Sequence, residues 1–87
     1  MKGESDKAIA DYTEAIRIDP DDALAYNNRG NAYNKAGQHD KAIADFTNAI
    51  RIKPDLALAY NNRGLVYSEL GQSVKAIAGY SADIRLS

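Results

Sequence analysis

Hydrophobic residues recur along the chain at intervals of three and four positions, with polar residues between them. In the middle of the sequence these are Ala42, Ile43, Phe46, Ala49 and Ile50. This spacing places apolar side chains on one face of an α-helix. The preceding stretch shows a similar pattern at Leu24, Tyr26, Gly30 and Tyr33. Gly37 lies between the two stretches and can supply the positive φ that often ends a helix, so the pattern predicts a helix–turn–helix unit.

The whole unit returns after 34 residues. The run Ala23-Leu-Ala-Tyr-Asn-Asn-Arg-Gly30 recurs as Ala57-Leu-Ala-Tyr-Asn-Asn-Arg-Gly64, and the run Lys-Ala-Ile-Ala occurs at residues 7–10, 41–44 and 75–78. Pro20 and Pro54 keep the same spacing, and the residue before a proline disfavours helix. A unit of this size cannot bury its own apolar face, so neighbouring units stack. The pattern predicts five helices, at Ser5–Ile18, Ala23–Ala36, His39–Ile52, Ala57–Leu70 and Ser73–Leu86.

The spacing of particular residues within each unit identifies a family resemblance. The first full unit reads Tyr26-x₂-Arg29-Gly30-x₂-Tyr33, then Ala42-x₃-Phe46, then Pro54. The second reads Tyr60-x₂-Arg63-Gly64-x₂-Tyr67, then Ala76-x₃-Tyr80, and the opening stretch carries Ala8-x₃-Tyr12 and Pro20. This pattern resembles the tetratricopeptide repeat, whose signature is Trp-x₂-Leu-Gly-x₂-Tyr, then Ala-x₃-Phe, then Pro.

The resemblance implies an all-α fold in which helix–turn–helix repeats stack as a right-handed solenoid. We expect one domain over residues 1–87. Residues 1–22 would be a half repeat with the second helix only, residues 23–56 a full repeat, and residues 57–87 a full repeat without a capping helix. The positions of these boundaries suggest a fragment of a longer array.

The chain departs from the family pattern at an apolar position. Arg29 and Arg63 stand where leucine is usual, and an unpaired buried guanidinium is costly. Asp11 and Asp45 occupy matching places in successive second helices and are candidate partners. The third copy has Gly79 at that place, so Asp83 either pairs with Arg63 instead or is exposed on a terminal helix.

Asparagine is the residue type that points to a binding function, because it is a poor helix former and propensity does not explain several in a helix interior. The resemblance implies that the first helix of each pair lines a concave groove that takes an extended peptide. Amide side chains suit this role because they both donate to and accept from a peptide backbone. The resemblance extends to one member of the family in which an asparagine ladder grips peptide backbone, and Asn28 and Asn62 match positions of that ladder. The expected groove consists of Leu24, Asn27, Asn28, Asn31, Asn34, Lys35, Leu58, Asn61, Asn62 and Leu65.

The sequence leaves the role of these asparagines open: they contact a ligand, they are solvated groove residues, or they cap neighbouring loops. Co-chaperone members of the family clamp a C-terminal carboxylate with Lys and Arg. The matching positions here hold Asn27, Leu58 and Asn62, so we do not expect a chaperone tail as the ligand.

The two ends of the predicted solenoid leave apolar stripes without a covering helix. Uncovered stripes promote association, so we expect a homo-oligomer. The residues concerned are Ile9, Tyr12, Ile16, Ile77, Tyr80 and Ile84.

Composition excludes several other classes of function. The 87 residues carry 11 basic and 12 acidic side chains, a formal net charge of -1, which does not suit a nucleic-acid or membrane-surface binder. There is no cysteine, and the one histidine, His39, has no set of converging ligands beside it. We expect no metal, no cofactor, no catalytic residue and no membrane span, in a soluble, cytoplasmic protein. The leading hypothesis is a non-catalytic protein–protein interaction scaffold that binds a peptide. Homotypic self-association is the alternative, and RNA binding is a distant third.

Overall fold

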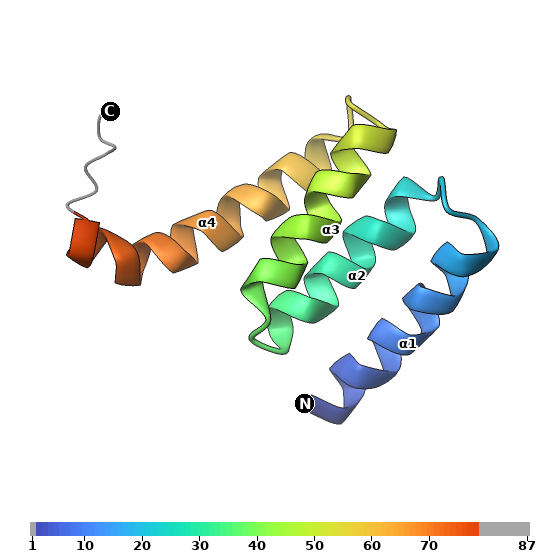
Figure 1. The fold of residues 1–87 in the computed structure, drawn as a ribbon, viewed down its shortest axis with the longest axis horizontal. Coiled ribbons are helices and arrows are strands. Elements are labelled where there is room, and N and C mark those ends of the chain that lie inside the picture. The colour runs from blue at the N-terminus through green and yellow to red at the C-terminus, as the bar shows by residue number, and fades with distance from the viewer. Residues whose placement is uncertain (1, 79–87) are drawn as a thin grey trace.

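Four helices make up the part of the chain that the computed structural model describes, which is residues 2–78, with side chains from Gly3 to Gly71. They are α1 (Lys2–Ile18), α2 (Ala23–Lys35), α3 (His39–Ile52) and α4 (Ala57–Ala78). Helix α2 packs between α1 and α3, and α4 packs on α3 and over a smaller area on α2. The last turns of α4 extend away from the other three helices (Figure 1). The expected all-α class is confirmed for these residues.

Local hydrogen bonds set the bounds of α2. Asp22 caps its start, because the Asp22 side chain accepts a hydrogen bond of 3.1 Å from the backbone N–H of Ala25. At its end Gly37 takes a φ of 81°. The backbone N–H of Gln38 then reaches the carbonyl of Tyr33 at 2.9 Å, and that of Gly37 reaches Asn34 at 3.0 Å. This pair of bonds is a Schellman motif, which ends a helix and turns the chain back.

Small residues let the helices approach closely around two apolar clusters. Ala23, Ala49 and Ala59 form one cluster, and Ala42, Phe46 and Val66 form the other. The closest approach is at Gly30, where an added Cβ would lie 2.7 Å from Phe46 Cε1. The core therefore depends on a glycine in α2 facing an aromatic ring in α3.

The predicted break after Leu70 is wrong, because α4 runs without interruption from Ala57 to Ala78. Residues 73–78 therefore extend α4 instead of starting a fifth helix at Ser73, and residues 79–87 lie outside the described part. The two units differ in the side chains at the position of the turn. After α2, a side-chain hydrogen bond of 2.6 Å between Asn34 Oδ1 and His39 Nδ1 spans the turn. The matching positions hold Ser68 and Ser73, so the amide and imidazole groups of that pair are not repeated there.

Candidate peptide-binding surface

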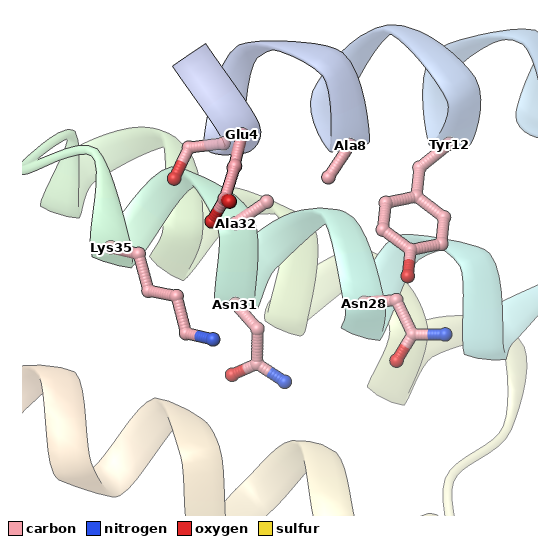
Figure 2. Close-up of a pocket in the computed structure, with 8 residues that line it drawn as sticks. Glu4, Ala8, Tyr12, Asn28, Asn31, Ala32 and Lys35 are labelled. Atoms are coloured by element: carbon pink, nitrogen blue, oxygen red, sulfur yellow. The ribbon is translucent and has the colours of Figure 1, made fainter. Parts of the chain in front are cut away.

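One face of α2 carries a strip of groove residues. Leu24, Asn28, Asn31 and Lys35 follow one another at i, i+4, i+7 and i+11, a spacing that puts them on one side of a helix. Leu24 is about half exposed, the two asparagines are partly exposed, and Lys35 is exposed. Figure 2 shows the side chains of Asn28, Asn31 and Lys35 extending from the same side of the helix. We call these four residues the α2 strip.

A matching strip lies on α4, 34 positions later. It consists of Leu58, Asn62 and Leu65, with the exposed Asn61 beside it. Leu58 is about half exposed, and Leu65 is 60% exposed. The α2 and α4 strips lie on neighbouring helices, because Asn62 Nδ2 donates a hydrogen bond of 3.1 Å to Asn27 Oδ1 of α2. We call Leu58, Asn61, Asn62 and Leu65 the α4 strip.

Asn27 is expected from its sequence position to lie on this surface, but it does not belong to it. Its side chain is 0% exposed. Its Oδ1 accepts from Asn62, while its Nδ2 has no hydrogen-bond partner among the described residues. Its position indicates this burial, because residues three apart lie on the same side of a helix and Gly30 packs against α3. Asn27 therefore joins α2 to α4 and does not face a ligand.

Asn34 is likewise a structural residue and not a groove residue. Asn34 Oδ1 accepts a hydrogen bond of 2.6 Å from His39 Nδ1 across the turn between α2 and α3. The loop-capping reading of the asparagines thus holds for Asn34. His39 is the partner of Asn34 in this hydrogen bond, which links the two sides of the turn.

The expected partner of Arg29 is confirmed. Arg29 Nε and Nη2 each donate a hydrogen bond of 2.8 Å to the two carboxylate oxygens of Asp45. These hydrogen bonds raise the pKa of the Arg29 guanidinium, and the cation also lies 5.6 Å from the ring centres of Tyr26 and Tyr33. A charge-assisted bidentate pair of this kind is a strong, directional contact.

Threonine is a second partner of these arginines that the sequence analysis missed. Arg29 Nη1 donates to Thr13 at 3.2 Å, and Arg63 Nη1 donates to Thr47 at 3.0 Å. Thr13 and Thr47 are themselves 34 positions apart, so the repeat offset could have identified them. Asp83 lies outside the described residues, so its pairing with Arg63 stays a hypothesis.

The repeat geometry agrees with the comparison of the sequence with known families. The family model of the TPR repeat matches residues 2–37 and again residues 30–71. The chain belongs to the tetratricopeptide repeat (TPR) family. TPR proteins are typically non-catalytic scaffolds, and their repeats generally mediate protein–protein interaction. No curated protein gives a significant match to this sequence. None of the helices in residues 2–78 has the length and continuous apolar character needed to cross a bilayer.

Helix α1 of this TPR chain exposes only part of its predicted apolar stripe. Ile9 and Tyr12 are partly exposed. Ile16 is only 9% exposed and belongs to the core, so it does not offer an open surface. Of the other predicted self-association residues, the side chain of Ile77 and the whole of Tyr80 and Ile84 lie outside the described part.

A pocket of about 530 Å³ lies between α1 and α2. Its lining comes from α1 and α2 and consists of Glu4, Ser5, Ala8, Tyr12, Asn28, Asn31, Ala32 and Lys35. Tyr12 points from α1 toward Asn28 of α2 (Figure 2). We call this the α1–α2 pocket.

Proposed function

We propose that this chain is a non-catalytic interaction scaffold that binds an extended peptide across the α2 and α4 strips. The observation that carries this proposal is the exposure of three leucines, Leu24, Leu58 and Leu65, on those two helices. Half-exposed leucines offer apolar contacts to ligand side chains. The amides between them offer hydrogen bonds to a ligand backbone.

Different residue types in the two strips would contact different parts of the peptide. Asn28, Asn31 and Asn61 have polar atoms available for a peptide main chain, while Asn62 uses Nδ2 to hold Asn27 and keeps its oxygen free to accept. The leucines discriminate among ligand side chains by burial. Lys35, exposed at the end of the α2 strip, favours an acidic group at that end of the ligand.

The experiment is selection from a displayed library of random peptides, followed by calorimetry with the best binder. Asn28→Ala and Leu65→Ala should each weaken that binder by about three- to tenfold, the effect of about one lost hydrogen bond or apolar contact. Asn48→Ala is the matched control, because Asn48 lies on α3 outside both strips, and it should leave binding unchanged. No selected peptide, or a peptide bound equally well by Asn28→Ala and Leu65→Ala, contradicts the proposal.

Homotypic self-association is a second candidate function, supported by a different observation. Tyr60 and Tyr67 on α4 are 46% and 53% exposed, whereas the matching Tyr26 and Tyr33 on α2 are partly buried by α3. An uncovered aromatic face of this kind favours association. Light scattering over a wide concentration range tests it, and a mass that stays that of a monomer would rule it out.

A further inference from the structure

Helix α2 is held in a seat formed by α3 and α4. Three contacts define this seat. Gly30 faces Phe46, Asn27 Oδ1 accepts from Asn62 Nδ2, and Arg29 pairs with Asp45. The floor of the seat is the cluster of Ala42, Phe46 and Val66, which is almost fully buried under α2. A helix that packs on α3 and α4 in this way therefore needs a glycine, an amide acceptor and an arginine at these positions.

The α1–α2 pocket is the same seat, one repeat earlier. The floor residues Ala42, Phe46 and Val66 correspond at the 34-residue offset to Ala8, Tyr12 and Ala32, and the donor Asn62 corresponds to Asn28. All four of these corresponding residues line the pocket, and Figure 2 shows Ala8, Tyr12, Asn28 and Ala32 around it. No helix among residues 2–78 fills this seat, so the α1–α2 pocket has the lining of a docking site for a helix like α2.

Helix α4 has the face that such a seat receives. Asn61, Arg63 and Gly64 correspond to the three seated residues Asn27, Arg29 and Gly30. A Cβ built at Gly64 meets no described atom within 4 Å. Tyr60 and Tyr67, on the same side of the helix, are about half exposed. No described residue therefore covers, on α4, the face that α2 buries.

The charges of the two uncovered elements are complementary. Asp11 holds on α1 the position that Asp45 holds on α3, and it is exposed with no ion pair among the described residues. Arg63 holds on α4 the position of Arg29, and Gly79 stands where the chain would need an acid. Arg63 has a hydrogen bond to Thr47 but no carboxylate partner among the described residues. Within the part of the chain that the structure describes, α1 thus carries an acid without its arginine, and α4 an arginine without its acid.

We propose that copies of this chain join head to tail, with α4 of one copy seated in the α1–α2 pocket of the next. In this joint Arg63 pairs with the partner's Asp11, Gly64 faces the partner's Tyr12, and Asn61 accepts from the partner's Asn28. The joint is heterologous, because it uses different surfaces of the two copies, so it builds an open array or a ring. It rests on the second candidate function above and gives it a defined geometry.

The joint uses two residues of the proposed peptide surface, Asn61 and the partner's Asn28, and leaves the rest of that surface open. Leu65 stays 60% exposed although α2 is seated beside it, and Asn31 is the matching residue in the α1–α2 pocket. A seated α4 would therefore leave the partner's Asn31 accessible. Joining copies would place further strips beside one another and lengthen the groove.

Charge reversal tests the joint. Asp11→Arg and Arg63→Asp each put like charges together, so each variant alone should self-associate on the order of a hundredfold more weakly than the wild type. An equimolar mixture of the two variants restores opposite charges at every joint and should recover the wild-type mass. Asp55→Arg makes the same charge change in an exposed loop and should leave the mass unchanged. Light scattering measures the masses, and circular dichroism confirms that each variant keeps its helices.

The outcomes separate the joint from self-association in general. A wild-type protein that stays monomeric at all concentrations overturns both. A wild-type protein that associates, with variants that associate equally well or a mixture that does not recover, overturns the joint and leaves self-association standing. That result would be expected if residues 79–87 of the same chain, or another protein, cover α4 instead.

Discussion

At the scale of single residues, Arg29 of α2 and Asp45 of α3 form a bidentate, mostly buried ion pair. It joins the two helices of one repeat through two parallel hydrogen bonds of 2.8 Å. The Asp45 side chain is 5% exposed and that of Arg29 is 17% exposed. Because Arg29 replaces an apolar residue of the family pattern, the fold needs the acid to compensate the buried cation.

We therefore predict that Asp45→Ala lowers the free energy of unfolding by about 2–4 kcal/mol, because it leaves a mostly buried guanidinium without its carboxylate. Asp55→Ala is the control, since its ion pair with Lys53 is largely exposed, and it should change stability by less than about 0.5 kcal/mol. Urea unfolding followed by circular dichroism measures both. Equal losses in the two variants would mean that the Arg29–Asp45 pair adds nothing.

Two glycines in matching positions should respond to alanine with opposite signs. At Gly30 a Cβ would lie 2.7–3.0 Å from three atoms of the buried Phe46 ring, and overpacking of this kind typically costs about 1–3 kcal/mol. At Gly64 the space is open, so alanine should add about 0.5–1 kcal/mol through helix propensity. Thermal unfolding should show Gly30→Ala below the wild type and Gly64→Ala above it. A stabilised Gly30→Ala variant would contradict the close packing of α2 on α3.

At the scale of elements, two matching glycines have different backbone conformations. Gly37 lies in the turn after α2, and Gly71 lies inside the continuous helix α4. Gly37 has a φ of 81°, where a Cβ costs about 1–2 kcal/mol. Gly71 lies inside α4 without a positive φ, where alanine should add about 0.5–1 kcal/mol. We predict that Gly37→Ala destabilises the protein and Gly71→Ala stabilises it, as measured by urea unfolding. A loss in both variants would mean that the chain turns at Gly71, as the repeat pattern alone predicts.

This turn shows how far the sequence determines the elements. The period of 34 residues correctly predicts helices over most of residues 2–70, because apolar spacing is copied from unit to unit. It fails after Leu70, because a turn depends on side chains that the period does not copy. Asn34 and His39 bridge the first turn, while serines stand at both matching positions.

Within the candidate site, sequence reasoning identifies the right helices but not the orientation of each asparagine. Four asparagines occur in α2, and a count cannot tell which of them face solvent. Packing decides it: Asn27 lies on the side of Gly30 and is buried, Asn34 turns to His39, and Asn28 and Asn31 remain on the surface. The sequence predicts an acid as the partner of the buried Arg29 and offers Asp11 and Asp45, and packing selects Asp45.

At the scale of the whole molecule, the internal repeat makes each end of the chain the counterpart of the other, and Gly64 provides a sharp test of this relation. Gly64→Ala should stabilise the isolated fold, because the added Cβ meets no described atom and glycine is a poor helix former. In a head-to-tail joint the same Cβ would press against the partner's Tyr12, as a Cβ at Gly30 would press against Phe46. We therefore predict a higher melting temperature together with self-association about tenfold weaker, since one overpacked contact costs about 1–3 kcal/mol.

Gly71→Ala separates this effect from a general change in the helix. Gly71 matches Gly37, which lies beyond the seated part of α2 and has no atom within 4 Å of a built Cβ. Alanine at Gly71 should therefore raise the melting temperature and leave self-association unchanged. Stability and association would then change in opposite directions at Gly64 only. If Gly64→Ala stabilises the fold and leaves the association constant of the wild type intact, α4 is not seated against Tyr12 and the copies meet through another surface.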